Sequence, residues 1–468
     1  MAKKSNVSLG SFVRFRNSRG VEARGSLVRL SRQQVVFEVY NPYSIVQLSE
    51  VLSEVRIMQG ERETYQGRAV VTGLLNTGLI LIVSASLVDP WSDLKGLVPG
   101  ELFRSYVKDF VSDWDACVAR LHQEFRLSVG NLRNYLQELS RWLEHWETEA
   151  DIKQSPNQAQ YVEEFVHDVD GEIAPRLTEL YAAFEDSSKA IDRKHAPFHR
   201  AYAQRELHPL MMCSPFMHRA FTKPLGYAGD FVMVQMMLSE PLEGSNTFAK
   251  LLNASALRHE APAAHRNRIQ LLHEALRRET RRALAESGTA KVLNLGCGPA
   301  EEVRRFVDED SESSCTEFRL VDFNTETLEH VQANLLPFAK QRRPEMIIKT
   351  EQRSVHEIIQ QSVEQKRADA PEFDMVYCAG LFDYFRDTTC GFLIELFYSW
   401  LKPGGVVLVT NVTPTHSSIA IMQYVLEWTL ELRDAAHMAK LVPELGQQHT
   451  YVDSTGVNVF LEIRKPKV

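Results

Sequence analysis

The sequence predicts an α/β protein whose C-terminal part is a mostly parallel sheet, preceded by a helical region and a small N-terminal β-barrel. Short β-branched runs separated by turn residues fill residues 1–94. Apolar residues at helical spacing characterise residues 95–265, and strand and helix patterns alternate over residues 266–468. Such alternation is typical of a parallel sheet covered by helices on both faces.

The composition is that of an average globular protein with an acidic balance. Of the 468 residues, 44% are hydrophobic, and 61 acidic residues outnumber 53 basic ones, which argues against general nucleic-acid binding. The first 32 residues differ, because their basic residues are opposed only by Glu22. This stretch indicates either a surface for an anionic ligand or lipid headgroup, or a solvated basic face. The basic residues are Lys3, Lys4, Arg14, Arg16, Arg19, Arg24, Arg29 and Arg32.

Neither a metal centre nor a membrane segment is expected. The six cysteines include no Cys-x-x-Cys pair, the basic opening lacks an apolar core behind it, and no apolar run is long enough to span a bilayer. We therefore expect a cytoplasmic protein without a structural metal.

The N-terminal barrel and the helical region are predicted from different periodicities. Strand-like runs separated by turns predict a barrel over residues 1–94: Val13–Arg16, Leu27–Leu30, Val35–Tyr40 and Leu79–Val83. From Val107 to Trp146 the apolar residues recur about every 3.5 positions, which predicts a long helix over about residues 104–149 that Gly130 could interrupt. This helix is either an ordinary bundle helix or the seam of a homodimer.

The C-terminal region contains six predicted strands: Lys291–Leu295, Phe318–Val321, Met346–Lys349, Phe373–Cys378, Val406–Thr410 and Val457–Ile463. Helices are predicted between strands at Thr325–Phe338 and Ser417–His437.

A glycine-rich turn follows the first of these strands, at Asn294-Leu-Gly296-Cys297-Gly298. The Gly-Lys-Ser/Thr of a P-loop is absent, and Glu301 and Glu302 at the next helix start would repel a dinucleotide pyrophosphate. Asp322, at the tip of the second strand, is placed to accept hydrogen bonds from ribose hydroxyls. A ligand with a ribose and a cation but no phosphate fits these residues best, and S-adenosyl-L-methionine is such a ligand.

The glycine-rich turn, Asp322 and the Leu401-Lys-Pro-Gly-Gly405 turn before a strand resemble a class I S-adenosylmethionine-dependent methyltransferase. The resemblance implies a Rossmann-like methyltransferase domain over residues 266–468, with the adenine near Ser354 and Val355. The residues that we expect to contact this cofactor are Asn294, Gly296, Cys297, Gly298, Asp322, Phe323, Ser354, Val355, Cys378, Ala379, Gly380, Gly226 and Asp230.

Residues of about 195–468 also resemble a bacterial subgroup, the 3-hydroxypalmitic acid methyl ester synthases. The motifs that carry this likeness are Leu207–Leu210, Ser214–Phe216, Lys223–Asp230, Gly380–Tyr384 and Thr455–Asn458 with Arg464–Pro466. The resemblance implies a fatty or other apolar carboxylic acid as methyl acceptor and a methyl ester quorum-sensing signal as product. The N-terminal region resembles a PilZ barrel, the cyclic di-GMP receptor, but Arg29-x-Ser31-x-x-Gln34 lacks that motif's acid and glycine. We do not expect cyclic di-GMP to bind there.

Candidate catalytic residues lie at strand ends and in a cover region at residues 205–240. Asp383 and Tyr384 follow the fourth strand, and Arg433 is expected either to pair with a substrate carboxylate or to be solvated. Lys223–Asp230 is either a cover, in which Tyr227 closes over the cofactor and Asp230 holds its ammonium group, or a turn capped by Asp230. His208 is either a general base or a structural histidine.

The sequence favours an O-methyltransferase acting on the carboxylate of a small apolar acid. A carboxylate is already ionised, so it needs no general base, whereas a hydroxyl or amine acceptor needs one. A methyltransferase acting on a hydroxyl or nitrogen of another metabolite is therefore the second hypothesis. A non-catalytic sensor of the cofactor or of a cyclic dinucleotide is the third.

Overall fold

The computed structural model describes residues 11–40, 46–59, 62–76, 80–89, 91, 101–150, 156–240, 242–364 and 372–467. The chain divides into two compact units, which we describe one at a time. Unit 1 comprises Met1–Ala228, Pro241–Leu257 and Ser417–Thr429, and unit 2 comprises Gly229–Glu240, Arg258–His416 and Leu430–Val468. None of the described helices combines the length and the apolar character that crossing a membrane requires.

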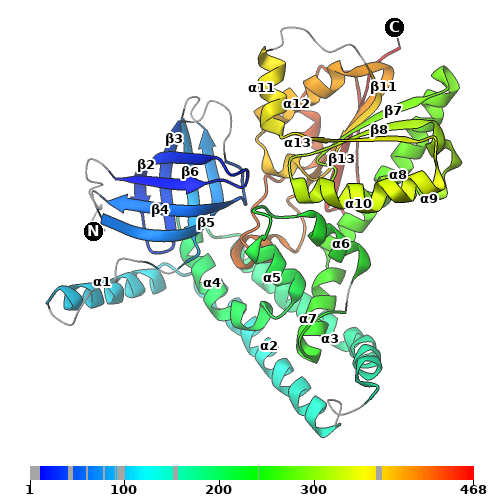
Figure 1. Cartoon of the computed structure of the whole chain (residues 1–468). Coiled ribbons are helices and arrows are strands. Elements are labelled where there is room, and N and C mark those ends of the chain that lie inside the picture. The colour runs from blue at the N-terminus through cyan, green and yellow to red at the C-terminus, as the bar shows by residue number, and fades with distance from the viewer. Residues whose placement is uncertain are drawn as a thin grey trace. The chain divides into compact units, whose positions relative to one another are not determined.

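Unit 1 begins with a closed antiparallel barrel, which confirms the predicted N-terminal barrel (Figure 1). Side chains alternate along each strand, so that Val13 and Phe15 of β1 are buried while Arg14 is exposed. Closure pairs both edges of the sheet, and buried side chains of all six strands fill the interior. In barrel order the strands are β1 Phe12–Arg16, β2 Glu22–Leu30, β3 Gln34–Tyr40, β6 Ile80–Leu87, β5 Arg62–Asn76 and β4 Val51–Gln59.

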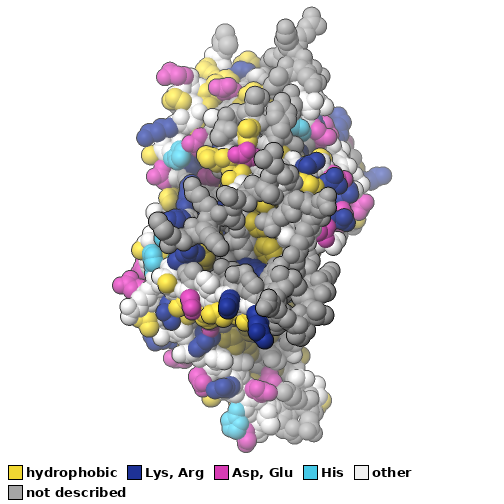
Figure 2. Space-filling model, turned by 90° about the vertical axis from the view of Figure 1, so that its left-hand side faces the viewer, with side chains coloured by type: hydrophobic (Ala, Val, Ile, Leu, Met, Phe, Trp, Pro, Cys, Tyr) yellow, Lys and Arg dark blue, Asp and Glu magenta, His cyan; other side chains and the backbone are white. Residues whose placement is uncertain are grey.

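Among the described arginines of the basic stretch, some are exposed and some are partly buried. The exposed ones are Arg14, Arg24 and Arg29, and the partly buried ones are Arg16, Arg19 and Arg32. The guanidinium carbons of Arg14 and Arg24 lie 5.6 and 3.8 Å from the centre of the Phe12 ring. Arg16 pairs with Glu54 at 3.4 Å. Figure 2 shows basic and acidic side chains interspersed on the face that it draws. Lys3 and Lys4 lie outside the described residues.

The segment that resembles a cyclic di-GMP motif forms the turn between β2 and β3. The Ser31 amide donates to the Gln34 carbonyl at 2.8 Å, and the Gln34 amide donates to Ser31 Oγ at 3.0 Å. Arg29 lies 3.4 Å from Gln34 Oε1. These contacts account for the segment as a local turn, and the likeness to a PilZ domain is not confirmed.

The stretch predicted as one long helix is two helices, α1 Glu101–Val118 and α2 Gln123–Glu149, and the chain breaks between them rather than at Gly130. In α2 the periodic apolar residues are buried, because α2 packs on α3 and α4 of its own unit. In α1, Phe110 and Trp114 are 66% and 46% exposed. The bundle interpretation therefore holds for α2, and the predicted homodimer stays a prediction for α1. The other helices of unit 1 are α3 Gln158–Ser188, α4 Ala196–Met211, α5 Pro215–Thr222 and α7 Thr247–Arg258.

The barrel packs on the helical part of unit 1 through polar contacts. Ser49 Oγ donates to the Thr429 carbonyl at 2.8 Å and accepts from the Thr429 amide at 2.6 Å. Buried Arg200, on α4, donates to Ser86 Oγ of β6 at 2.7 Å. Removal of residues 1–94 would remove these contacts, although Arg200 would keep its hydrogen bond to the Gln423 carbonyl. We predict that the rest of the chain can still bind a cofactor without the barrel.

Unit 2 is built on a seven-stranded sheet in the order β12-β13-β11-β10-β7-β8-β9. β13 is antiparallel to both of its neighbours, and the other strands run parallel to one another. The six predicted strands are all present, and β12 is an additional strand. Their bounds are β7 Ala290–Leu295, β8 Thr316–Asp322, β9 Ile347–Gln352, β10 Phe373–Cys378, β11 Leu401–Val412, β12 Gln447–Val452 and β13 Asn458–Arg464.

Helices cover both faces of this sheet, as the alternating pattern predicted (Figure 1). Alternate residues of β10 serve the two cores: Met375 and Tyr377 face one, Val376 and Cys378 the other. On the first face lie α8 Glu260–Ser287, α9 Glu301–Glu309 and α10 Thr325–Arg342. On the second lie α11 Val355–Glu364, α12 Asp387–Ser399 and α13 Ala435–Ala439. Helix α6, Phe231–Ser239, packs on α8.

The helix predicted over Ser417–His437 is not continuous. A π-helical turn at Ile421–Val425 belongs to unit 1, and α13 belongs to unit 2. Glu427, between them, has a φ of 51°, which is left-handed and incompatible with a continuing α-helix. The amide of Arg433 instead donates to the Val412 carbonyl at the end of β11.

Candidate functional site

The candidate site lies at the carboxyl ends of β7 and β10, in unit 2. In the sheet order, β8 and β9 lie on one side of β7 while β10 and β11 lie on the other. Such a reversal of strand order is where open α/β sheets bind ligands. Gly296 follows β7 and Gly380 follows β10, so both predicted glycines flank this point. A Cβ built on Gly296 would lie 3.5 Å from the Leu381 side chain, which shows that the two loops meet.

The glycine-rich turn is held against the end of β8. The amides of Gly296 and Cys297 donate to the Val321 carbonyl at 2.8 and 3.1 Å. Gly296 and Gly298 have φ values of 70° and 52°, a conformation in which most residues with a side chain are strained. A Cβ on Gly298 would meet no described atom within 4 Å, so the turn faces open space.

Asp322 lies beside this turn, as the sequence predicted. Its Oδ2 accepts from the Gly298 amide at 3.2 Å, and its Oδ1 accepts from the Asn324 amide at 3.0 Å. Burial raises the pKa of the Asp322 carboxyl to about 6. Each carboxylate oxygen has two lone pairs, so the group retains capacity for hydroxyl donors. Phe323 follows it and is partly buried.

Beneath the turn, a buried polar network supports its shape. Glu302 Oε1 accepts from Tyr377 Oη at 2.7 Å and from Asn294 Nδ2 at 3.1 Å. Burial raises the pKa of Glu302, and burial also raises that of the Cys297 thiol. Asn294 therefore supports the turn through its hydrogen bond to Glu302. The sequence pattern did not reveal that Glu302 is buried and partnered in this way.

At the end of β9, Ser354 caps α11. Its Oγ donates to Glu357 Oε2 at 2.8 Å, and the Ser354 amide donates to the same oxygen at 2.7 Å. The Glu357 amide donates back to Ser354 Oγ at 3.2 Å, which completes a capping box. The Ser354 side chain and buried Val355 thus have structural partners, and adenine binding there stays a prediction.

The loop after β10 places Asp383 at the base of the site. Gly380 has a φ of 86°, and its amide donates to Thr410 Oγ1 at 3.0 Å. Asp383 Oδ1 accepts from the Val412 amide at 2.6 Å, and burial raises the pKa of this carboxyl to about 6. Cys378 points into the core, whereas Ala379 and Tyr384 are partly buried.

Arg433 is buried and contacts acceptors of the protein itself. It is 2% exposed and forms an ion pair with Asp387 at 2.8 Å. It also donates to the carbonyls of Phe382 and Phe385 and to Asn411 Oδ1, at 3.0, 2.5 and 2.7 Å. These acceptors use the donors of the guanidinium, so Arg433 holds the Phe382–Phe385 loop in place. The expectation of a solvated arginine is therefore wrong, and pairing with a substrate carboxylate stays a prediction.

In the predicted cover segment, Gly226 and Asp230 form structural contacts. Gly226, with a φ of 86°, faces Ser18 of the barrel, where a Cβ would lie 2.9 Å from the serine Cβ, and its carbonyl accepts from the Val51 amide. Asp230 caps α6 by accepting from the Met233 amide at 3.0 Å. The segment crosses from unit 1, which includes Tyr227, to unit 2.

His208 lies in unit 1, where its Nε2 lies 2.8 Å from the Val425 carbonyl. This contact requires a proton on Nε2, because a carbonyl oxygen can only accept. Burial lowers the pKa of His208. The structural interpretation of this histidine accounts for these contacts.

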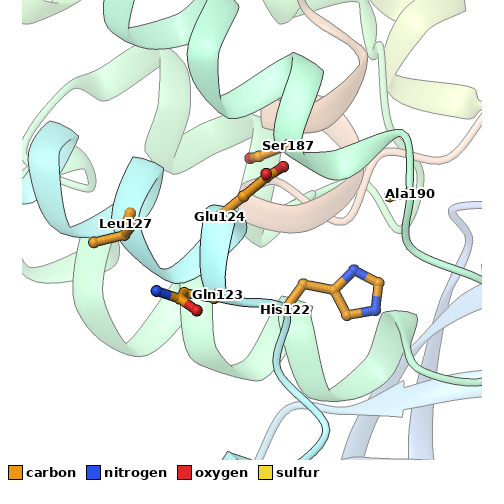
Figure 3. A pocket seen from close by; sticks show the side chains of 6 residues that line it. All are labelled: His122, Gln123, Glu124, Leu127, Ser187 and Ala190. Carbon is orange, nitrogen blue, oxygen red and sulfur yellow. The ribbon is translucent and has the colours of Figure 1, made fainter.

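A surface hollow in unit 1 is separate from the predicted residues. It has a volume of about 590 Å³ and is lined by His122, Gln123, Glu124, Leu127, Ser187 and Ala190 (Figure 3). Its lining comes from the start of α2 and the end of α3, and none of the candidate site residues belongs to it.

Comparisons with known proteins give distant similarities. No family model matches the chain, and no curated protein matches it. A solved structure of a possible exported protein from Bordetella parapertussis is 15% identical, with a TM-score of 0.40, covering 67% of this chain and 99% of that one. The N-methyltransferase NodS from Bradyrhizobium japonicum, in complex with S-adenosylhomocysteine, is 14% identical, with a TM-score of 0.29, covering 42% and 87%. Magnesium protoporphyrin IX methyltransferase from Synechocystis, with bound S-adenosylmethionine, is 9% identical, with a TM-score of 0.31, covering 44% and 82%.

Proposed function

We propose that unit 2 is a class I S-adenosylmethionine-dependent methyltransferase. The observation that carries the proposal is the hydrogen bond from the Gly298 amide to Asp322, at a glycine turn that faces open space. It joins the two elements that the methyltransferase motifs require, at the reversal of strand order where such sheets bind ligands.

The residues of the turn fit this cofactor. We propose that Gly296 and Gly298 lie against its methionine half, that Asp322 accepts from its ribose hydroxyls, and that Ala379 and Gly380 line the methyl-donor pocket. When bound, S-adenosylmethionine supplies a methyl group on a cationic sulfur. The chain's own task is to align an acceptor and exclude water, which accounts for most of the catalysis in such a displacement.

For the acceptor, we propose the carboxylate of a small apolar acid, with a 3-hydroxy fatty acid as the first choice and a methyl ester as the product. The motif resemblance over residues 195–468 supports this choice. The methionine-rich helix α6 supports an apolar acceptor, because flexible methionine side chains suit an acyl chain. This helix packs on α8, where Arg266 Nη1 donates to the Met237 carbonyl at 2.8 Å. Since a carboxylate is already ionised, no general base is required.

The test has two stages. Calorimetry should show that the wild-type chain binds S-adenosylhomocysteine and that Asp322→Ala, folded by circular dichroism, binds at least tenfold more weakly. An acceptor screen with labelled donor should then give a methyl ester from a 3-hydroxy fatty acid. Unchanged affinity in Asp322→Ala rejects the cofactor site. Methylation of another acceptor without any ester formation rejects only the acceptor.

A second candidate is methylation of an amine or hydroxyl, which needs a general base. Asp383 favours it, because a carboxyl group with a pKa of about 6 is suited to accept a proton near neutral pH. The pH dependence of the rate separates the two candidates. With saturating S-adenosylmethionine, the rate of carboxylate methylation should not change with pH near 6, whereas the rate of a base-catalysed reaction should rise with pH through about 6 and be lost in Asp383→Asn.

We also propose that Lys223–Asp230 covers the site, because a class I sheet leaves its cofactor open at the strand ends and methyl transfer requires that water is excluded. Tyr227→Phe and Asp230→Asn each remove one polar function and keep the shape, and the asparagine can still cap α6. A lower rate or cofactor affinity in either variant supports the cover. If both variants match the wild type, the segment acts as a connecting turn.

A further inference from the structure

Arg268, on α8, lies against the loop that closes the candidate site. A Cβ built on Gly380 would lie 2.8 Å from Arg268 Nη1, 3.1 Å from Nη2 and 3.2 Å from Cζ. The guanidinium plane therefore occupies the space beside the Gly380 Cα, at the carboxyl end of β10. Only a glycine at this position leaves that space open. No sequence motif surrounds Arg268, and the sequence did not indicate this contact.

His265 holds the guanidinium from one side. Arg268 Nη2 lies 2.7 Å from His265 Nδ1, one helical turn earlier on α8. The imidazole must be neutral to accept this hydrogen bond. Its pKa is held well below the usual value by burial and by the neighbouring charges of Arg268 and Arg266.

The positive charge of Arg268 has no close counterion among the described residues. The ionisable groups that face it are Asp383, Tyr384 and Cys378 from β10 and its loop, and Glu302 from α9. No carboxylate of the described chain lies within 4.0 Å of the Arg268 nitrogens. Burial lowers the pKa of Arg268. Arg268 is partly buried, and of the five N–H donors of its guanidinium only Nη2 has a hydrogen-bond partner among the described residues, His265.

Other arginines of the same helix show that this is specific to Arg268. Each of them has a carboxylate within 3.0 Å: Arg266 with Glu240, Arg277 with Asp310, Arg278 with Glu279, Arg281 with Glu312 and Arg282 with Glu279. Helix α8 therefore pairs these five arginines with carboxylates, whereas the arginine beside Gly380 has no ion pair among the described residues. A charge kept unpaired at the ligand end of the sheet points to an anionic ligand group.

We propose that Arg268 binds a ligand carboxylate at the carboxyl end of β10, positioned by His265 and by the absent side chain of Gly380. The inference rests on the proposed methyltransferase function, which offers two sources of this chemistry. One is the methionine carboxylate of the donor, and the other is the carboxylate of the acceptor acid. In either case the planar guanidinium can form two parallel hydrogen bonds to the two oxygens.

The experiment compares Arg268→Gln and Arg268→Lys with the wild type, using ligands with and without a carboxylate. S-adenosylhomocysteine carries the amino-acid carboxylate, and 5′-methylthioadenosine lacks it. If the donor is the source, Arg268→Gln should weaken S-adenosylhomocysteine about 10- to 100-fold and leave methylthioadenosine within twofold. Arg268→Lys should recover part of the loss, since it restores the charge without the planar fork.

If the acceptor is the source, both nucleoside affinities stay unchanged and the KM for the acid rises about 10- to 100-fold. Arg281→Gln is the matched control, because Arg281 lies on the same helix with its own partner, Glu312. It should change none of these values. Retained methylthioadenosine binding by Arg268→Gln shows that the pocket is folded.

Two results overturn the inference: unchanged affinities and KM in Arg268→Gln, or equal losses for both nucleosides. If the wild type binds neither nucleoside, the proposed cofactor is wrong, and Arg268 is then tested with octanoate alone. Saturable octanoate binding that is lost in Arg268→Gln but kept in Arg281→Gln upholds the carboxylate site. Absence of octanoate binding to the wild type then rejects it.

Discussion

Two arginines of unit 2 lie beside the same loop and have opposite surroundings. Arg433 is enclosed by an aspartate, an asparagine and two backbone carbonyls, which together engage its guanidinium. Arg268, on the other side of the Gly380–Phe385 loop, has one neutral histidine and no carboxylate within 4.0 Å among the described residues. The several acceptors around Arg433 make it part of the fold, whereas the few protein partners of Arg268 are consistent with its proposed role in binding a ligand.

The largest expected effect comes from Arg433→Met. The variant removes the charged donor from the buried Asn411 Oδ1 and from the carbonyls of Phe382 and Phe385, so we expect a loss of about 3 kcal/mol in the free energy of unfolding. Urea unfolding followed by circular dichroism measures it. Arg268→Gln should lose far less, because it orphans only the His265 acceptor. Equal losses in the two variants would remove the distinction between them.

Gly380→Ala should combine a local strain with a displaced guanidinium. The left-handed φ of 86° costs a side-chain residue about 1–2 kcal/mol, and the new Cβ would force Arg268 to move. Gly288→Ala is the matched control, with a φ of 74° and open space around its Cβ position. Both should lose similar stability, but only Gly380→Ala should weaken carboxylate ligands in calorimetry. If Gly380→Ala and Gly288→Ala bind carboxylate ligands equally well, the contact between Gly380 and Arg268 does not affect binding.

Asp322 should make cofactor affinity depend on pH. Its pKa is raised to about 6 by burial, and hydroxyl donors favour the ionised form, so S-adenosylhomocysteine affinity should fall about tenfold per pH unit below 6. The raised pKa also affects the stability of the free protein. Between about pH 4 and pH 6 the Asp322 carboxyl ionises in the unfolded chain but stays protonated in the folded one, so the free energy of unfolding falls as the pH rises. Calorimetry between pH 5 and 8 tests the affinity. Asp322→Asn should bind S-adenosylhomocysteine weakly, and its affinity should not depend on pH in this range. An unchanged pH dependence in this variant would show that another group causes it.

The smallest effect should come from Ser354→Ala. It removes one half of the capping box of α11, and caps of this kind contribute about 1 kcal/mol to stability. If the adenine is recognised near this position through the backbone, S-adenosylhomocysteine affinity should stay within twofold. Thermal unfolding and calorimetry on the same samples test both statements. A large loss of affinity with little loss of stability would make the Ser354 hydroxyl a direct ligand contact.

Much of unit 2 could be predicted because its signals are local. Strand and helix periods located the six expected strands, and the glycines marked a turn that only residues tolerant of positive φ adopt easily. The spacing from that turn to the end of the next strand placed Asp322 within hydrogen-bonding distance of Gly298. Strand β12 was missed, and the helix over Ser417–His437 failed because long-range contacts hold its residues in another conformation.

The sequence by itself determined the class of fold, the closed barrel, and the turn and acid that define the candidate cofactor site, because periodicity and backbone conformation depend on neighbouring residues. Tertiary structure alone decided which charged side chains are enclosed and which are left without counterions. Arg433 and Arg268 look alike in sequence, each an arginine in an apparently amphipathic segment. The partners of Arg433 come from segments 22–51 residues away in the chain, and Gly380, which Arg268 lies against, is also distant, so only the folded protein distinguishes the structural arginine from the one proposed to bind a ligand.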